Sequence, residues 1–576
     1  MYTLNIIISD GEGSFGVPIT VGFREIKWES GQVLLNGNAL EIRGIDYRQE
    51  SHGVGAAIST EQIERDLTRI RNQGFNLVRV TGSVPHPATY DICDRLGLML
   101  LPGTGLRGVP IGLMTQPAFR SRLESMLRRE ILSNDHHPSV LGWEMVDWAP
   151  YSPTLLEIAI EVRSTVLAGR DEALFIGFAS DVAQDLPDGI VGMRNRIPYL
   201  FEERVTPQSV SHGAWLAAGL GALASPLTLD EDSLQSEIRQ SDALVRQVNA
   251  IRELPLAGFI IDSYNDRRAA LPMLIAGAQL ETDLIRRGLV TEGREERISW
   301  QRVGDLLGQV QIDVPVVESP KVQFPVEFPI ATLIIGGILL LMMRQNNVFR
   351  HNLRRVFAHT HGFFADIVDR RYFQGGQTML VAIIFATAQG VLLASLLNHS
   401  RFYFGLDYLF TLIIPFYQAK ALLVYWAWHP IYAILAFSAI VLVLWIVGAV
   451  ALRLLSIPFP GQMKLRHSLA LIFWAATCFL PLIPLGLVHY RLLDFAWFKW
   501  VQISLFGLFW FWFLIRVSSV IRVGFRVSSR TAWILIFIII LVTAGSLVTV
   551  YRGGFAITDY IRYYSDVILP WIEGPA

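Results

Sequence analysis

Long apolar stretches dominate this chain of 576 residues from about Phe328 onward, and they constrain its fold more than any other feature. A helix needs about 18 or more apolar residues to cross the roughly 30 Å of hydrocarbon in a bilayer. Residues 1–325 instead carry an ordinary mix of charged residues, glycine and proline. The sequence therefore predicts a soluble region followed by a multi-pass membrane region, with the lipid bilayer as a partner.

A second apolar feature, Leu406–Trp428, contains Pro415, Gln418 and Lys420. If it crossed the membrane, the basic segment Arg453–Arg466 would lie outside the cytoplasm, against the usual placement of Lys and Arg. We therefore interpret it as re-entrant or interfacial and expect six spans, with seven as the alternative. The six are Ile330–Met343, Thr378–Leu397, Ile431–Leu452, Leu469–Val488, Val501–Ile515 and Ala532–Val550.

Basic segments set the expected orientation. Arg344–Gly376, Arg453–Arg466 and Arg516–Arg530 are rich in arginine and should face the cytoplasm. With six spans, the soluble region and the tail 552–576 then lie outside the cytoplasm, as in a bacterial inner or plasma membrane protein. The chain opens at Met1 in a strand-like run rather than a signal peptide, so we expect an export signal upstream and a truncated reading of a longer gene.

Short apolar strands alternate with amphipathic helical segments in the soluble region. The helical segments include Thr60–Asn72, Gln116–Leu132 and Ser233–Arg252. Eight strands separated by helices over about 250 residues predict an α/β fold, the (β/α)8 or TIM barrel, with an open doubly wound sheet as the alternative. The expected strands are Leu40–Tyr47, Leu77–Thr81, Leu98–Leu101, Val140–Val146, Ala173–Phe178, Gly189–Met193, Ala214–Gly221 and Leu256–Tyr264.

A series of short motifs covers residues 20–150 without large gaps. The motifs are Gly22–Ile26, Leu34–Gly37, Ile42–Ile45, Asp66–Ile70, Gly74–Arg79, His86–Asp94, Gly97–Leu98 and His137–Trp143. Their order and spacing resemble the barrel of family 2 glycoside hydrolases, the relatives of β-galactosidase and β-glucuronidase. Residues 150–270 resemble the later part of that barrel more weakly.

The resemblance implies a division of the chain. Residues 1–28 would be the remnant of an immunoglobulin-like β-sandwich, and residues 29–309 the glycosidase-like barrel. Residues 310–329 contain four prolines and are expected to form an extended linker, because proline interrupts helices. An all-α transmembrane region, 330–551, and an extracytoplasmic tail, 552–576, would complete the chain.

The resemblance also implies where the catalytic carboxylates should be. Retaining glycosidases need two carboxyl groups about 5 Å apart, one as acid and base and the other as nucleophile. The position of the acid falls on Trp148, and that of the nucleophile falls on Gly219. An indole cannot protonate a leaving group, so the resemblance implies a catalytically degenerate barrel.

Further polar groups of the family pattern are also replaced. Gly82 stands in place of a histidine, Pro102-Gly103 in place of Asp-Glu, and Ile261 in place of a tryptophan. Because these independent positions all follow the carboxyl ends of strands, where TIM barrels place their chemistry, their joint replacement argues for lost catalysis on a retained scaffold.

Asp147, which takes the place of the family's asparagine, and Glu144 remain weak catalytic candidates. At about 3.3 Å per residue, Glu144 is expected to lie roughly 13 Å deeper in the barrel than position 148. Asp147 could instead hydrogen-bond a sugar hydroxyl. For Asp262 and Asp266, which follow the last expected strand, we expect a structural role.

The mouth of the barrel could still bind a glycan without hydrolysing it. Aromatic faces stack on pyranose rings, and carboxylates or amides bind their hydroxyl groups. For Trp143 and Trp215, the alternative is an ordinary place in the core. The candidate ligand-binding residues are Asp147, Trp148, Arg79, Trp215 and Tyr264.

No metal or other cofactor is expected. His136 and His137 lack further ligands at suitable spacing, and the two cysteines, Cys93 and Cys478, lie in different halves. The formal charge of −1 gives no reason to expect a nucleic-acid partner. Few ionisable residues fall inside the expected spans, so transport is weakly indicated.

Three functions are compatible with these features. The first is a membrane-anchored, family 2 glycosidase-like protein that binds a glycan or a partner outside the cytoplasm without hydrolysis. The second is an active membrane-bound β-glycosidase with rearranged carboxylates. The third is an envelope assembly or transport component that uses the barrel to dock an envelope protein.

Overall fold

The chain divides into two compact units in a computed structural model. The first unit comprises Met1–Pro320, Tyr403–Pro415 and Ile557–Ala576, and the second comprises Lys321–Phe402 and Phe416–Ala556. The first unit is thus assembled from three separate stretches of the chain. The structure describes residues 2–9, 14–29, 32–179, 186–195, 215–226, 229, 231–254, 256–308, 324–369, 375–461, 463–495, 497–555 and 557–568.

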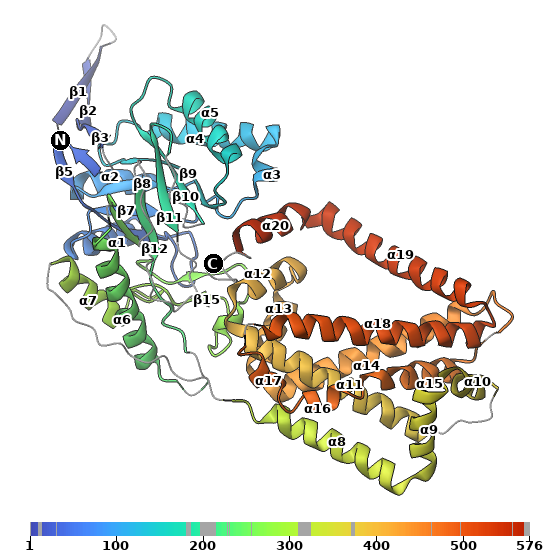
Figure 1. Cartoon of the computed structure of the whole chain (residues 1–576). Helices are drawn as coiled ribbons and strands as arrows, with labels where there is room; N and C mark the ends of the chain where they lie inside the picture. Colours follow the sequence, from blue (N-terminus) through green and yellow to red (C-terminus); the bar gives the residue numbers. More distant parts are fainter. Residues whose placement is uncertain are drawn as a thin grey trace. The chain divides into compact units, whose positions relative to one another are not determined.

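Eight parallel strands form the centre of the first unit (Figure 1). They are β6 (Ile42–Tyr47), β7 (Leu77–Val80), β8 (Met99–Pro102), β9 (Gly142–Ala149), β10 (Ala173–Phe178), β11 (Ile190–Asn195), β12 (Trp215–Leu220) and β13 (Gly258–Ile261). Their order is β8-β7-β6-β13-β12-β11-β10-β9. The two edges meet where Leu100 N donates to Ser139 O and Leu141 N donates to Leu100 O, each at 2.8 Å. The predicted (β/α)8 barrel is confirmed, and the open-sheet alternative is wrong.

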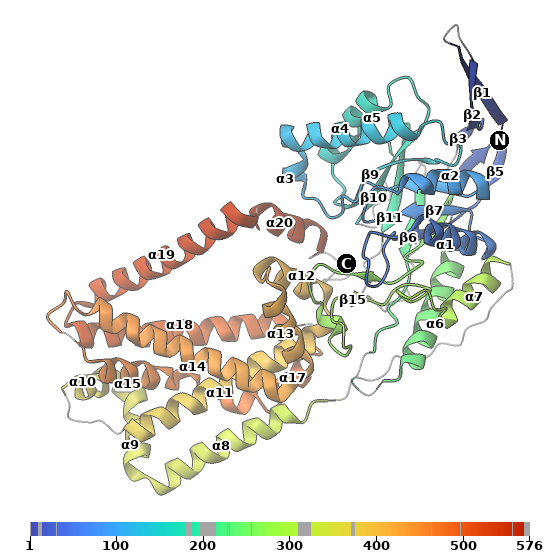
Figure 2. The ribbon, with the colours of Figure 1, turned by 180° about the vertical axis from the view of Figure 1, so that it is seen from behind.

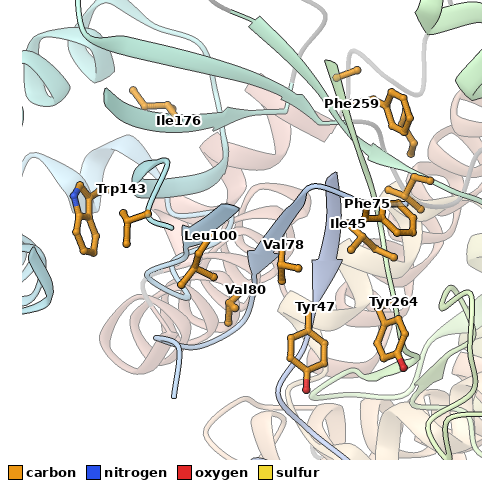
Figure 3. Close-up of a cluster of buried hydrophobic side chains, with 14 of the residues drawn as sticks. Ile45, Tyr47, Phe75, Val78, Val80, Leu100, Trp143, Ile176, Phe259 and Tyr264 are labelled. Carbon is orange, nitrogen blue, oxygen red and sulfur yellow. The ribbon is translucent and has the colours of Figure 1, made fainter. Parts of the chain in front are cut away.

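The strands are buried on both faces, so successive residues enter two different apolar clusters. Leu77 and Leu101 pack with Phe175 inside the barrel, whereas Val78 and Leu100 pack outward against the helices. Figure 3 shows the outward cluster, with Val78, Val80 and Leu100 among its labelled side chains. This alternation follows the two-residue repeat of a strand and decides which polar residues point into the barrel.

Helices surround the strands (Figure 2). α1 (Thr60–Asn72), α4 (Pro117–Asn134) and α6 (Ser233–Arg252) lie where helical segments were predicted. The N-terminus of α1 is capped by the Ser59 side chain, which accepts a hydrogen bond from Gln62 N. The remaining long helices of this layer are α2 (Pro87–Leu96), α5 (Pro153–Val166) and α7 (Ile298–Leu307).

Two small antiparallel sheets precede the barrel. β1 (Tyr2–Ser9) and β2 (Ser14–Val21) form an antiparallel pair of strands. β3 (Ile26–Glu29), β4 (Gln32–Leu35) and β5 (Asn38–Leu40) form a second sheet. This second sheet contributes Val33 and Trp28 to the inner cluster, and the Trp28 ring meets the edge of Phe175 at 5.6 Å between centroids.

Five helices of the second unit are long and apolar enough to cross a membrane, within the described residues. The prediction of six long spans differs from this at Leu469–Val488. There the chain forms α15 (Leu465–Ala475), the short 3-10 turn η3 (Ala476–Phe479) and α16 (Leu482–Leu485). The five are Glu327–Gln345 (α8), Gly375–Phe402 (α11, Gly375–His399, with η2, Ser400–Phe402), Pro430–Leu455 (α14), Trp500–Phe525 in α18 (Phe498–Phe525) and Ser529–Tyr551 in α19 (Ser529–Phe555).

Proline explains the interruption of the expected fourth span. Pro481 and Pro484 follow η3 closely, and each lacks the backbone N–H that a continuing helix requires. A second difference concerns the expected fifth span, which ends at Ile515 in the prediction. α18 continues to Phe525 and thereby buries Arg516.

The doubtful apolar stretch Leu406–Trp428 does not form one long helix. It forms α12 (Phe404–Ile413) and α13 (Tyr417–Trp428), separated at the residues around Pro415. The basic segment after α8 forms two helices, α9 (Asn347–Ala358) and α10 (Thr360–Val368). Excluding Leu406–Trp428 from the long spans therefore agrees with the helix lengths.

Candidate functional site

Charged and polar side chains lie inside the barrel, at the carboxyl ends of the strands. Asp46 in β6, Arg79 in β7, Glu144 in β9, Asn195 in β11 and Asp262 after β13 are all buried. Each lies an even number of residues from an inward apolar or glycine position of the same strand, so the alternation of the strand directs it inward. TIM-barrel enzymes have their active sites at this end of the barrel.

Arg79 lies at the centre of this cluster and binds three carboxylates. Its Nε lies 2.7 Å from Glu144 Oε2, its Nη2 lies 2.8 Å from Asp147 Oδ1, and its Nη1 lies 3.5 Å from Asp46 Oδ1. Burial alone would lower the pKa of Arg79, but the charges of Asp147, Glu144 and Asp46 outweigh burial and raise it. The guanidinium group is therefore charged and fixed by its partners.

Asp147 is held in its ionised form. Its Oδ1 accepts hydrogen bonds from Arg79 and, at 2.5 Å, from Asn195 Nδ2, while Arg107 Nε lies 3.6 Å from Oδ2. Burial would raise the pKa of Asp147, but Arg79 and Arg107 lower it overall. Gly177 leaves room for this arrangement, because a Cβ atom there would overlap Asp147 Oδ1.

An irregularity in β9 brings Glu144 and Asp147 to the same guanidinium group. Strict alternation would turn residues three apart to opposite faces of a strand. The pairing of β9 with β10 shifts register at Phe175/Ile176, so Asp147 turns inward as well. The strand-spacing argument that kept Glu144 well below the mouth did not include this bulge.

Trp148, at the expected position of the acid, is built into the wall of the mouth. Its φ of 55° lies in the left-handed region, which costs a residue with a side chain about 1–3 kcal/mol. The Arg107 guanidinium carbon lies 4.5 Å from its ring centroid, and its carbonyl accepts a 2.6 Å hydrogen bond from Tyr563 Oη. These contacts hold the strained residue in place.

Further aromatic residues of the first unit extend from Trp148. Phe404 of α12 meets the indole edge at 5.8 Å, and Tyr408 of the same helix lies 6.1 Å from Tyr563 of α20 (Ile557–Tyr563) and 6.2 Å from Tyr564, between ring centroids. We call these five residues the aromatic cap. It joins stretches of the chain that lie more than 100 residues apart to the end of β9.

Gly219, at the expected position of the nucleophile, also has a left-handed backbone, with φ 68°. A glutamate would adopt this conformation only with strain, whereas glycine does so freely. The carbonyl of Gly219 accepts a 2.6 Å hydrogen bond from Arg287 Nη2. An arginine therefore contacts the backbone where an active enzyme of the family would need a carboxylate.

Asp262 pairs with two arginines through one oxygen atom. Its Oδ2 lies 3.2 Å from Arg287 Nη1 and 3.7 Å from Arg267 Nη2. Burial would raise the pKa of Asp262, but Arg267, Arg287 and Arg107, among others, lower it strongly. The structural role expected for Asp262 agrees with these ion pairs.

The pKa of Asp46 is raised into the neutral range, and burial also raises the pKa of Glu144 above its usual value. Burial, with the negative charges of Asp262, Asp147 and Glu144, raises the pKa of Asp46 to about 7, against the opposing charge of Arg79. Sequence reasoning did not select Asp46. Its inward position in a predicted strand was the available signal.

The aromatic candidates other than Trp148 lie in tightly packed places. Trp215 is 1% exposed and packs against Phe178, at 5.6 Å between centroids. Tyr264 is fully buried and donates a hydrogen bond from its hydroxyl to Asp66, at 3.2 Å. Trp143 is likewise buried in the outward cluster. Of the five candidates, the structure brings Arg79, Asp147 and Trp148 together and leaves Trp215 and Tyr264 in the core.

Histidine does not add a metal centre to this region. His137 Nδ1 lies 2.7 Å from Asp94 Oδ2, a contact within the scaffold. Among the described residues, no group of three or more His, Cys, Asp or Glu side chains has a metal-binding arrangement.

The comparison with protein families matches residues 26–163 to the model described as "Glycosyl hydrolases family 2, TIM barrel domain". This range includes the Arg79 cluster on β6, β7 and β9 and the position of Trp148. Gly219 lies beyond it. The first part of the chain therefore carries a family 2 glycosidase-like TIM barrel domain.

Curated relatives share only this part of the chain. A β-galactosidase of Aeromonas hydrophila subsp. hydrophila is 30% identical over 155 residues, which cover 26% of this chain and 15% of that protein. A β-galactosidase of Alteromonas mediterranea is 31% identical over 143 residues, covering 23% of this chain and 13% of that protein. The chain thus spans less than a sixth of the length of either relative.

Two solved structures of glycosidases also match part of this chain. A GH2 β-galacturonidase from Eisenbergiella tayi bound to galacturonate is 21% identical, with a TM-score of 0.44, covering 52% of this chain and 56% of that one. A β-glucuronidase from Ruminococcus gnavus is 15% identical, with a TM-score of 0.46, covering 53% and 56%.

Proposed function

We propose that this protein is a membrane-anchored, family 2 glycosidase-like protein whose barrel binds a glycan outside the cytoplasm without hydrolysing it. The observation that supports the proposal is the residue at the position where we expect the proton donor. That residue, Trp148, lies inside the matched range 26–163, and its indole stacks under Arg107. Hydrolysis of a glycosidic bond needs a carboxylic acid at that place.

The remaining carboxylates support the same conclusion. Glu144 and Asp147 bind Arg79, and Asp262 binds Arg287 and Arg267. A nucleophilic carboxylate must leave its partners to attack the sugar, and an acid must hold a proton beforehand. Carboxylates fixed between buried arginines are poorly suited to either task, but their oxygen atoms and the arginine donors suit sugar hydroxyl groups.

The composition of the first unit supports a membrane topology with six crossings. Its three stretches form one compact body, so if the second unit crosses a bilayer, all three lie on the same side. Among the described residues between Pro320 and Tyr403 there are two long apolar helices, an even number. Those described between Pro415 and Ile557 form three, and the interrupted apolar helix Leu465–Phe479 brings the number to four. With the basic segments facing the cytoplasm, the barrel lies outside it.

A second candidate, an active glycosidase with rearranged carboxylates, is favoured by one observation. The pKa of Asp46 is raised to about 7, whereas those of Asp147 and Asp262 are lowered. Two carboxyl groups with pKa values pushed apart are typical of an acid and its ionised partner. The contacts of Asp46 with Arg79 and of Asp147 with Arg79 and Asn195 weigh against this candidate.

The test uses the full chain in lipid nanodiscs, with a panel of chromogenic β-glycosides and a glycan array. We expect no turnover, and glycan binding that Asp147→Asn weakens. Asp135→Asn, which removes a partly exposed carboxylate paired with Arg170, is the matched control. Turnover that disappears in Asp46→Asn or Asp147→Asn would establish the active glycosidase instead. If no glycan binds and only an envelope protein is retained, the barrel is a docking module.

A further inference from the structure

Arginine side chains outnumber carboxylates around Asp262. Arg287 and Arg267 both pair with its Oδ2 atom, and the charges of Arg107 and Arg48 also act on it. Asp147, the partner of Arg107, is already bound to Arg79 at 2.8 Å. Arg107, Arg267 and Arg287 therefore have one carboxylate, Asp262, that is not already paired with another arginine of the barrel.

Two donors of these arginines have no acceptor. Within the part of the chain that the structure describes, the buried Nε atoms of Arg267 and Arg287 make no hydrogen bond, and Arg287 Nη1 has only its 3.2 Å ion pair with Asp262 Oδ2. Arg287 is 2% exposed and Arg267 is 7% exposed, so water reaches them poorly. A buried donor without a partner costs about 1–3 kcal/mol, and more when it is charged. A ligand oxygen atom that accepts hydrogen bonds from these donors would remove that cost.

The lowered pKa values of two of these arginines indicate that the cluster has too little negative charge to balance its positive charge. Burial and the neighbouring charge of Arg267 lower the pKa of Arg107. Burial also lowers the pKa of Arg287. The charges of Arg267 and Arg107 lower it further, while Asp262 and, more weakly, Asp46 raise it. An added anion would remove this mutual repulsion.

Two of the arginines also contact the two positions where we expected catalytic carboxylates, Trp148 and Gly219. Arg107 lies over the Trp148 ring, and Arg287 donates to the carbonyl of Gly219. A glycosidase surrounds a developing positive charge on the sugar with carboxylates. Guanidinium groups in the same places oppose such a charge and favour a negative one, so the site has the opposite electrostatic preference.

We propose that Arg107, Arg267 and Arg287 form a binding site for an oxyanion, a carboxylate or phosphate group carried by the ligand of the barrel. The inference rests on the proposed non-hydrolytic binding and names its ligand class, an acidic glycan. Guanidinium groups bind both oxyanions through paired N–H donors. Arg107 keeps 30% of its side-chain surface exposed and is the most accessible of the three arginines.

The experiment measures ligand binding to the full chain in nanodiscs by calorimetry, at constant ionic strength. The probes are glucuronate, glucose 6-phosphate, glucose and inorganic phosphate. We expect the acidic sugars to bind at least tenfold more tightly than glucose. Preference for glucuronate identifies a carboxylate as the recognised group, and preference for glucose 6-phosphate together with inorganic phosphate identifies a phosphate.

Matched variants distinguish the site from general attraction to positive charge. Arg267→Gln and Arg107→Gln should each weaken the acidic probe about tenfold or more and leave glucose unchanged. Arg170→Gln removes the same charge from a partly exposed ion pair with Asp135 and should leave binding of every probe unchanged. Using both site variants keeps the test decisive if one of them fails to fold.

Equal binding of acidic and neutral sugars would overturn the oxyanion site and leave the proposed glycan binding intact. Equal weakening by Arg170→Gln and Arg267→Gln would also overturn it. If no saccharide of either kind binds and the glycan array is negative, the proposed function itself fails.

Discussion

The guanidinium carbon of Arg107 lies 4.5 Å from the centre of the Trp148 ring, and this pair defines the chemistry of the barrel mouth. A cation over an aromatic face gains about 0.5–2 kcal/mol, more when water is excluded. Trp148 is only 6% exposed, so the pair is well shielded. The position expected to donate a proton instead supports a fixed positive charge.

Restoring the missing acid should therefore not restore hydrolysis. In Trp148→Glu, the new carboxylate would lie against Arg107, which favours its ionised form and prevents proton donation. We expect no turnover of chromogenic β-glycosides by this variant. Trp148→Gln is the control of equal size. Turnover by the glutamate variant alone would contradict the proposed degeneracy.

Removing Arg79 should destabilise the barrel strongly. Arg79→Gln leaves Glu144, Asp147 and Asp46 buried without their shared counter-charge, and such a loss costs about 3–5 kcal/mol. Thermal unfolding in nanodiscs measures the effect. Arg170→Gln, in a partly exposed pair, should cost only about 1 kcal/mol. Similar melting temperatures for the two variants would show that the cluster does not support the fold.

Stability should depend on Asp46 between about pH 4 and pH 7. Its folded pKa of about 7 is above the unfolded value of about 3.9, so the folded chain binds the proton more tightly. The stabilisation is complete below the unfolded pKa and is lost as the pH rises through 7. Asparagine stays neutral, so Asp46→Asn should gain melting temperature relative to wild type from pH 5 to pH 8. Parallel curves for the two proteins would refute the raised pKa, and Asp135→Asn serves as control.

The hydroxyl of Tyr563 should hold the C-terminal segment to the barrel. Tyr563→Phe removes the donor to the Trp148 carbonyl and leaves a buried acceptor unpaired, at a cost of about 1–3 kcal/mol. We expect faster hydrogen exchange in residues 557–568 of the variant. Tyr560→Phe makes the same atomic change on the same helix and should have little effect. Unchanged exchange in Tyr563→Phe would separate this contact from the stability of the segment.

Six crossings predict the labelling of single cysteines. In a Cys93→Ser, Cys478→Ser background, cysteine at His52 or Tyr403 should react with an impermeant reagent on one side of the membrane. Cysteine at Asn347, the first residue of α9, should react only from the other side. Labelling of positions 52 and 403 from opposite sides would rule out this topology.

Most of the barrel was predictable because its signals are local. Each predicted strand is a short apolar run bounded by polar residues, and all eight are present within a few residues of their expected ends. The expected long span Leu469–Val488 failed because hydropathy alone was counted. Pro481 and Pro484 interrupt the helix although the stretch is apolar throughout that region.

Residues of the candidate site were predictable only where they lie within, or at a known distance from, a family motif. Trp148 and Gly219 came from the order of the family motifs, and the structure assigns left-handed backbone to both. Arg287 lies in an irregular loop with no periodic pattern, so its contact with Gly219 depends on the tertiary fold. Asp147 points inward because of a register shift in β9, which no strand pattern reveals.

The three-part composition of the first unit has a consequence for how the protein is made. Phe404 and Tyr563 leave the ribosome long after the eight strands have been translated, with long apolar helices synthesised in between. Until both residues have been made, the end of β9 lacks its aromatic partners. A folding defect far along the chain would therefore affect the barrel mouth.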